Sequence, residues 1–212
     1  MFKELKSYLD ENKVKLVAVS KTRPQKSILE LYDQGQRLFG ENRVQELVDK
    51  HSELPKDIAW HMIGSLQKNK VKYIAPFISL IHSVDSLGLA QTIEKEAIKN
   101  NKKINILLQV KIAKEDSKAG YDIDQLMTEL PDILEFKNIN ILGLMGMGTF
   151  TKDTNLTTAE FKFLTKKFRD LKESTFSNSE NFTEISMGMS GDYKIAVQCG
   201  TTMVRIGSLL FS

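Results

Sequence analysis

Short apolar runs alternate with longer stretches of helical periodicity along almost the whole chain. The apolar runs, several of them rich in β-branched residues, predict eight strands. The segments between them repeat apolar residues every three or four positions and predict seven amphipathic helices, and an eighth such segment precedes the first strand. The predicted strands cover residues 15–22, 37–42, 59–65, 79–86, 103–113, 138–148, 182–190 and 202–211. The predicted helices cover residues 1–13, 24–35, 43–54, 67–77, 87–101, 122–136 (broken or kinked at Pro131), 156–174 and 191–199.

The strict order of strand and helix predicts parallel strands joined by right-handed crossovers. Eight such units close into a (β/α)8 TIM barrel, and because such barrels usually run longer, we expect short loops. An open doubly wound sheet is the alternative, but SKTRPQ stands where its glycine-rich turn would follow the first strand. No linker or repeat interrupts the pattern, so we expect one domain over residues 1–212.

Composition excludes several classes of protein. The 212 residues are 41% hydrophobic and 27% charged, as in ordinary globular proteins. Thirty basic against 27 acidic residues leave a net charge of +3, too small a bias to suggest nucleic acid as a partner. Cys199 is the single cysteine, which favours a reducing compartment. The N-terminus has no apolar signal core and no run reaches transmembrane length, so we expect a cytoplasmic protein without a membrane partner.

Polar residues and glycines stand where the predicted strands end. Because the carboxyl ends of barrel strands meet at one rim, these residues are expected to converge there. They are Ser20, Lys21 and Thr22; Gly40, Glu41 and Asn42; His61, Gly64 and Ser65; His82, Ser83 and Asp85; and the segments MGMG (145–148), MGMSGD (187–192) and RIGS (205–208).

Each of these features has a structural explanation when it is taken alone. A lysine after a strand is usually solvated, and a histidine near a strand end is more often structural than catalytic. His61 and His82 have no cysteine or spaced carboxylate partner, so we expect no metal site. The combination is more specific. Loops after strands 7 and 8 of a barrel often bind phosphate, and Ser190, Gly191, Gly207 and Ser208 suit that role.

A lysine across the barrel mouth from a phosphate site suggests a phosphorylated aldehyde as ligand, because a neutral lysine amine attacks aldehydes. Six segments of the chain resemble signature segments of one family and follow one another in the same order as they do there. They are VAVSKTRP, FGENRVQE, WHMIGSLQKNK, HSVD, ISMGMSGD and GTTMVRIGS. The chain is similar to the YggS/PROSC family of pyridoxal 5′-phosphate (PLP) homeostasis proteins. The resemblance implies a single barrel of the alanine racemase N-terminal type (PLP fold type III).

The resemblance also implies roles for particular residues. Lys21 falls on the lysine that carries PLP as an aldimine, a Schiff base, and Asn42 falls on a residue lining the cofactor. Ser190, Gly207 and Ser208 fall on the phosphate cup, and Arg205 on the residue facing the pyridine nitrogen. Three departures leave the local shape of the rim open: Gly191 replaces a common acidic residue, Lys111 replaces the usual asparagine, and GLMGMGTF lacks a common proline. The chain is also somewhat short for the family.

The expected function is intracellular PLP (vitamin B6) and amino-acid homeostasis without robust catalysis. A permanent cation at the ring nitrogen weakens PLP as an electron sink. The chain also ends just after strand 8, so we expect no second domain to supply the other base of a racemase. We expect a monomer that binds PLP and passes it to apo forms of PLP-dependent enzymes. The alternatives are a PLP-dependent amino-acid racemase or lyase, which turnover of L-amino acids would reveal, and a Schiff-base aldolase without PLP, which a colourless protein would indicate.

Overall fold

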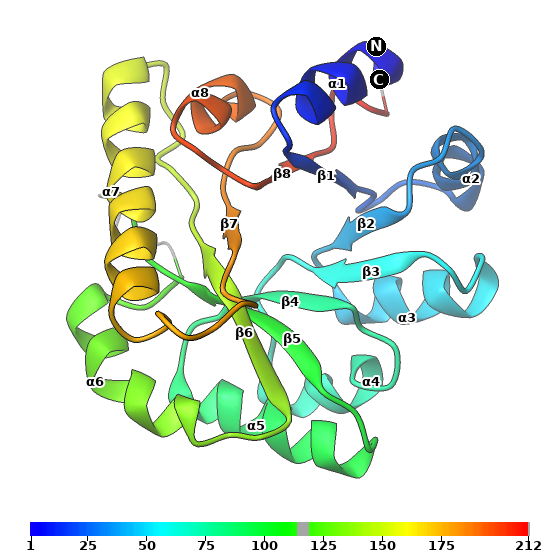
Figure 1. Cartoon of the computed structure of the whole chain (residues 1–212). Coiled ribbons are helices and arrows are strands. Elements are labelled where there is room, and N and C mark those ends of the chain that lie inside the picture. The colour runs from blue at the N-terminus through cyan, green and yellow to red at the C-terminus, as the bar shows by residue number, and fades with distance from the viewer. Residues whose placement is uncertain (114–118, 212) are drawn as a thin grey trace.

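Eight parallel strands close into a barrel in this computed structural model, which describes residues 1–113 and 119–211. Each strand pairs with the next in the chain, and the last pairs with the first, so that the sheet has no free edge (Figure 1). This topology confirms the predicted (β/α)8 fold. The strands are β1 (Lys15–Val19), β2 (Leu38–Glu41), β3 (Ala59–Met62), β4 (Leu80–Val84), β5 (Ile104–Gln109), β6 (Ile139–Met145), β7 (Glu184–Ser186) and β8 (Met203–Ile206).

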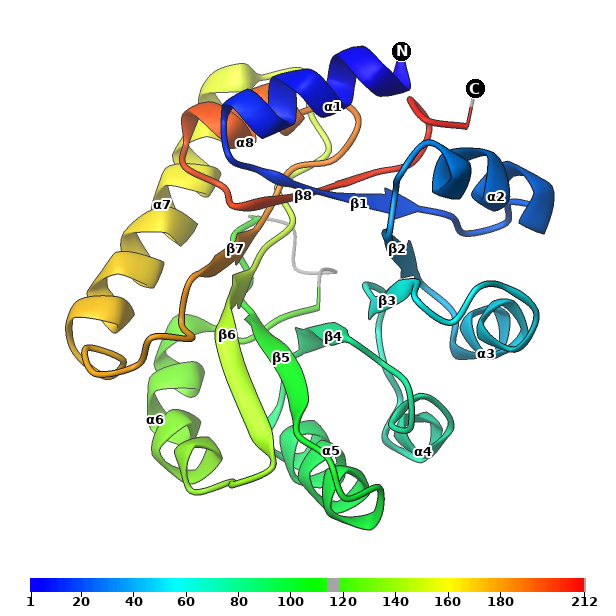
Figure 2. The same cartoon turned by 45° about the vertical axis from the view of Figure 1, so that its right-hand side comes forward.

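Helices surround the strands on the outside of the barrel (Figure 2). The first helix precedes β1 and packs through Leu5 and Leu9 against apolar residues of β1 and β8. The helices are α1 (Phe2–Glu11), α2 (Gln25–Asp33), α3 (Val44–Glu53), the short 3-10 turn η1 (Lys68–Lys70), α4 (Val71–Ile74), α5 (Leu87–Lys99), α6 (Ile123–Leu134), α7 (Thr154–Glu173) and α8 (Tyr193–Gln198).

Two local predictions differ from the structure. Of the two outcomes predicted at Pro131, a break is wrong, because helix α6 continues through Pro131 to Leu134. The carbonyl that Pro131 leaves without a donor belongs to Met127, a residue that is 48% exposed, so the missing bond falls on the solvent side. The strands are also shorter than predicted, because their polar ends are loops. Strand β1 ends at Val19, so Lys21 lies two residues beyond it.

The core has two parts, one on each side of the sheet. The larger part lies between the strands and the helices and contains the bulkiest buried side chains, among them Phe39, Trp60 and Phe161. The barrel interior holds a small apolar cluster of Val17, Leu80, Leu107, Met145 and Met203. That cluster does not fill the interior, and buried polar side chains occupy part of it.

A glycine allows β6 and β7 to approach closely at an irregularity in the sheet. The pairing of β5 with β6 shifts register between Ile106 and Leu107, opposite Gly143. Gly143 has a φ of +153°, and a Cβ there would lie 1.8 Å from the Glu184 carbonyl oxygen. Since that atom is backbone, it cannot move aside without breaking the pairing of the two strands.

We expect Gly143→Ala to destabilise the protein by about 3 kcal/mol or more, because it combines a backbone clash with an unfavourable φ. Gly191→Ala is the control, since a Cβ at Gly191 would meet no atom within 4 Å. That variant should stay within about 0.5 kcal/mol of the original protein. Urea unfolding measures both, and equal stability of the two variants would contradict the packing described for Gly143.

Candidate functional site

The loops after β1, β7 and β8 meet at the rim of the barrel. Gly207, which follows β8, lies so close to β1 that a Cβ there would be 3.1 Å from the Val19 carbonyl oxygen. Its backbone N–H donates to Ser190 Oγ at 3.4 Å, which joins the β7 loop to the end of β8. Ser190 and Gly207 are therefore neighbours, as the sequence predicted, and the chain turns at Lys21 two residues after Val19.

This rim presents backbone N–H groups without partners. Among the described residues, the N–H groups of Ser190, Gly191, Ser208 and Leu209 make no hydrogen bond. Ser208 and Gly191 are exposed, and Ser190 is half-buried. Successive backbone N–H groups without partners are the kind of donors that bind an anion without needing a lysine or arginine.

Arg205 lies deeper in the barrel, two residues before Gly207. It is 4% exposed, and its Nη1 donates to both the carbonyl and the hydroxyl oxygen of Ser186, at 2.8 and 2.6 Å. Its Nη2 donates to the Gly146 carbonyl at 3.0 Å. Burial lowers the pKa of Arg205 to about 10, with Asp192 acting in the opposite direction, so the guanidinium keeps its charge at neutral pH.

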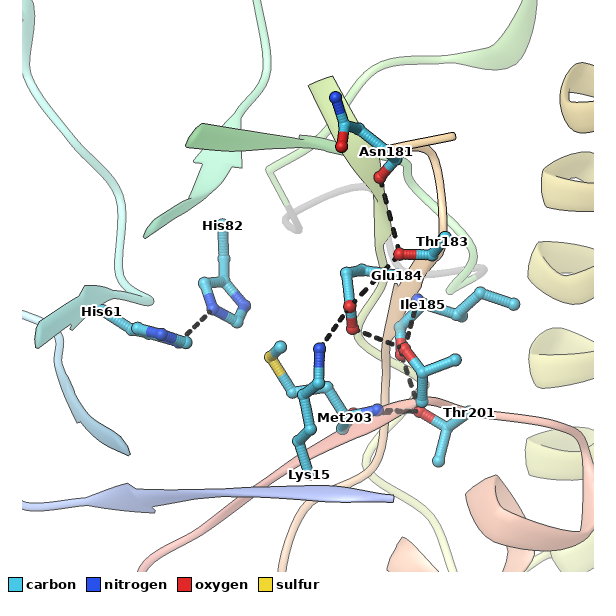
Figure 3. A network of polar contacts seen from close by, with 10 residues as sticks. Lys15, His61, His82, Asn181, Thr183, Glu184, Ile185, Thr201 and Met203 are labelled. Carbon is cyan, nitrogen blue, oxygen red and sulfur yellow. Dashed lines mark hydrogen bonds and ion pairs between the residues drawn. The ribbon is translucent and has the colours of Figure 1, made fainter. Parts of the chain in front are cut away.

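The arginine does not pair with Glu184, the carboxylate at the start of β7. Glu184 instead forms an ion pair with Lys15 and accepts a hydrogen bond from Thr202 at 2.9 Å (Figure 3). Arg205 is therefore a buried cation held by neutral oxygen atoms. Its hydrogen-bond acceptors are uncharged and Asp192 acts on it only through its charge, so its remaining N–H donors can still bind an anion or a neutral acceptor.

A buried ion-pair network supports the turn that carries Lys21. Ser20, which is fully buried, donates its hydroxyl to Glu41 Oε1 at 2.6 Å. Lys50, on α3, donates to the Ser20 carbonyl, to Glu41 and to Glu46, at 2.7 Å each. These bonds hold Ser20 on the helix side of the sheet. The neighbouring Lys21 is exposed, and no ion pair or hydrogen bond within the described residues ties it down.

The same network also fixes the backbone of Thr22, the residue after Lys21. Glu46 accepts the Thr22 backbone N–H at 2.5 Å, and Thr22 has a φ of +61°. That conformation needs such support in a residue with a β-branched side chain. Burial raises the pKa of Glu41, although Lys50 and Ser20 oppose it through hydrogen bonds. Glu41 Oε2 is buried without a partner in the described part of the chain. The network thus holds the turn rigid, at the electrostatic cost of burying the Glu41 carboxylate.

Asn42 completes the predicted set. It follows β2 and is half-buried, and a Cβ at Gly64 would lie 2.5 Å from its carbonyl oxygen. Only glycine lets the loops after β2 and β3 come this close. Within the described residues, the side-chain amide of Asn42 makes no hydrogen bond. The structure therefore brings Ser190 and Gly207 together beside Val19, and it places Lys21 and Asn42 on the turns after β1 and β2. Arg205 lies deeper in the barrel and pairs in register with Val17.

Sequence reasoning missed one group of polar residues in the barrel interior. His61 Nδ1 and His82 Nε2 lie 3.0 Å apart (Figure 3), and His82 Nδ1 lies 3.0 Å from Ser186 Oγ. The two histidines were candidates by position, but Ser186 carried no signal of its own. Burial lowers the pKa of His61 to about 3, helped by the positive charge of Lys15, and burial holds the pKa of His82 well below its usual range.

The remaining sequence expectations concern the rim and the absence of other sites. Lys111 follows β5, and its backbone N–H donates to the Tyr121 carbonyl at 2.9 Å. In the described residues, no group of three histidine, cysteine or carboxylate side chains could hold a metal ion. Every helix in residues 1–113 and 119–211 is too short or too polar to span a bilayer.

Comparison with known proteins adds a family to this geometry. The family model for the alanine racemase N-terminal domain matches residues 2–212. The pyridoxal phosphate homeostasis protein of Aquifex aeolicus (strain VF5) is 39% identical over 202 residues, which are 95% of this chain and 87% of the relative. The protein of the same name from Helicobacter pylori (strain J99) is 40% identical over 208 residues, covering 97% and 90%.

Solved structures agree with this result. PipY of Synechococcus elongatus PCC7942 without PLP superposes with a TM-score of 0.91 at 37% identity, and each chain is covered to 99%. The PLP-bound form of PipY gives a TM-score of 0.89 with the same identity and coverage.

Lys50→Met should destabilise the protein by about 3 kcal/mol at pH 8, because it leaves the buried Glu41 carboxylate without its cation. The loss should be smaller at pH 5. Without Lys50 the pKa of Glu41 rises further, and a proton then removes the buried charge. Adding Glu41→Leu to Lys50→Met should recover much of the stability at pH 8. Urea unfolding at both pH values tests this, and a loss that does not depend on pH would exclude an ionised Glu41.

Proposed function

Because the chain belongs to the alanine racemase N-terminal domain family and, within it, to the pyridoxal phosphate homeostasis proteins, we propose that it carries PLP covalently on Lys21. The observation that carries this proposal is the set of unpartnered N–H groups beside Gly207, at the rim that also bears Lys21 in the described structure. When bound, PLP supplies an aldehyde that reacts with a primary amine and a pyridine ring that can withdraw electrons.

The cup formed by the loops after β7 and β8 suits a phosphate dianion. Within the described chain, the N–H groups of Ser190, Gly191, Ser208 and Leu209 are free to donate, and two of these residues add hydroxyl groups. Gly207 lets the end of β8 lie close to β1, because a Cβ there would be 3.1 Å from the Val19 carbonyl oxygen. Acidic side chains are missing at these four positions, so a dianion meets donors and no fixed negative charge among them.

Lys21 suits the role of the covalent anchor. Its turn is fixed by the buried bonds of Ser20 and by the Glu46–Thr22 bond, while its own side chain is free of partners in the described structure. A rigid turn fixes the point from which the lysine side chain extends, so the backbone loses little entropy when the amine reacts. Asn42, on the neighbouring strand end, has a side-chain amide that no described residue binds and that is free to line the cofactor.

Arg205 is proposed to face the pyridine nitrogen. Three of its five N–H donors are used on Ser186 and Gly146, and its Nε–H makes no hydrogen bond among the described residues. Since the guanidinium stays charged at neutral pH, a ring nitrogen beside it accepts a hydrogen bond and stays unprotonated. An unprotonated ring withdraws electrons weakly, which supports homeostasis without robust catalysis.

The alternative function is a PLP-dependent racemase or lyase. A racemase needs a proton donor on each face of the substrate, and among the proposed site residues Lys21 is the one side chain suited to such a transfer. His61 and His82, two further titratable side chains of the barrel interior, are buried and bonded to each other. We therefore favour a single-barrel carrier over residues 1–212, acting as a cytoplasmic monomer with apo PLP-dependent enzymes as recipients.

The purified protein should show a visible absorption band from bound PLP, and borohydride should fix the cofactor on the peptide containing Lys21. Lys21→Ala should lose both signals. Lys26→Ala, an exposed lysine on α2, is the matched control and should keep them. Peptide mass mapping identifies the modified residue, and an adduct on another lysine would refute the assignment of Lys21.

Ser190→Ala should weaken retention of PLP about tenfold or more, because a hydrogen bond to a charged group contributes about 1.5–3 kcal/mol. Ser52→Ala, an exposed serine on α3, should leave affinity unchanged. Equilibrium dialysis with PLP gives both dissociation constants. If Ser190→Ala binds PLP as tightly as the original protein, the phosphate lies elsewhere.

A further inference from the structure

Four side chains from four strands form a continuous hydrogen-bonded row in the barrel interior. It runs from Arg205 on β8 to Ser186 on β7, then to His82 on β4 and His61 on β3, with separations of 2.6, 3.0 and 3.0 Å. All four residues are at most 4% exposed. Their positions in the sequence are far apart, so closure of the barrel is what brings them together. Figure 3 shows the two histidines at one end of the row.

The chemistry of the four groups gives the row one direction. A guanidinium can only donate, so Ser186 Oγ accepts from Arg205. The serine has one proton, and within the described residues His82 Nδ1 is the acceptor in reach of it. If the serine accepted from both neighbours, its buried O–H would have no acceptor, at a cost of about 1–3 kcal/mol.

The tautomers of both histidines follow from that direction. His82 Nδ1 accepts from Ser186, so a neutral His82 carries its proton on Nε2 and donates it to His61 Nδ1. His61 then carries its own proton on Nε2. Both rings are neutral because burial lowers the pKa of each below its usual range. The charge of Lys15 lowers the pKa of His61 further, and His61 and Arg205 lower that of His82.

We propose that Ser186, His82 and His61 form a one-way hydrogen-bond chain in which His82 is a positioning residue for Arg205. His82 takes the serine proton and so turns the lone pairs of Ser186 toward the guanidinium. Both Nη1 hydrogens are then bound by Ser186 and one Nη2 hydrogen by Gly146. The edge that remains for a ligand presents Nε–H and one Nη2–H, which are donors only.

This arrangement makes the interior selective for a ring nitrogen with a free lone pair. The inference rests on the proposed function where it concerns PLP, whereas the direction of the chain is a property of the protein alone. A test therefore needs one measurement without PLP and one with it.

The direction of the chain can be measured by ¹⁵N NMR of the histidine side chains in PLP-free protein. The sequence has three histidines, so the signals can be assigned from single variants. We expect His61 and His82 to show protonated Nε2 and unprotonated Nδ1, with no change between about pH 5 and 8. Protonated Nδ1 on either ring, or titration within that range, would overturn the proposal whether or not the protein binds PLP.

The positioning role can be measured with PLP labelled with ¹⁵N in its ring. His82→Leu removes the acceptor for Ser186 and should raise the dissociation constant of PLP about three- to tenfold, the worth of one hydrogen bond. It should also shift the ring nitrogen signal. His82→Asn, whose Oδ1 can accept the serine proton, should stay within about twofold of the original protein and keep its signal.

Leu107→Met is the matched control, because it changes the apolar part of the same interior without touching the chain. It should leave affinity and ring signal unchanged. If His82→Leu does not fold, Ser186→Ala replaces it with the same expected shift. An unchanged ring signal in these variants, or equal losses in His82→Asn and His82→Leu, would overturn the positioning role. Failure of the original protein to bind PLP would instead refute the proposed function.

Discussion

The buried charge of Arg205 is the constraint on which the barrel interior depends. A guanidinium that is 4% exposed has lost nearly all its water, so its donors need protein acceptors or a ligand. Two backbone carbonyls and the Ser186 hydroxyl supply part of that need. The serine can accept only if its own proton goes elsewhere, and His82 receives it. One cation thereby determines the chemistry of neighbours on three other strands.

A second buried cation, Lys50, lies outside the sheet. It holds Ser20 and Glu41 together behind the first turn, so the backbone before Lys21 is fixed while the lysine itself is free of described partners. The two cations are therefore used differently. Arg205 sits among neutral oxygens and keeps its charge available to a ligand, whereas Lys50 is matched by two carboxylates and stabilises structure. Both cations are buried, so burial does not distinguish these roles. The charge of their hydrogen-bond partners does.

Most of the fold was readable from the sequence, because alternating apolar runs and amphipathic segments leave few topologies other than a parallel barrel. The rim residues were also readable, since they follow the strands directly. The His61–His82–Ser186 chain was not, because it depends on which residues of β3, β4 and β7 point inward at the same level. For the same reason the sequence does not show that Glu184 pairs with Lys15 and not with Arg205. Strand register decides which side chains meet inside the barrel, and the pattern of a single sequence does not contain that register.

The contrast between a rigid interior and an open rim bears on how a carrier could release its cargo. The groups proposed to hold the ring and phosphate are fixed by buried bonds or by close backbone contact at Gly207. The proposed anchor, Lys21, is exposed, so an incoming amine could reach its bond to the cofactor without any opening of the barrel. An enzyme that protects a reactive intermediate needs the opposite arrangement, with the anchor enclosed and water excluded. Exposure of the anchor above a fixed interior therefore favours exchange of the cofactor over chemistry performed on it.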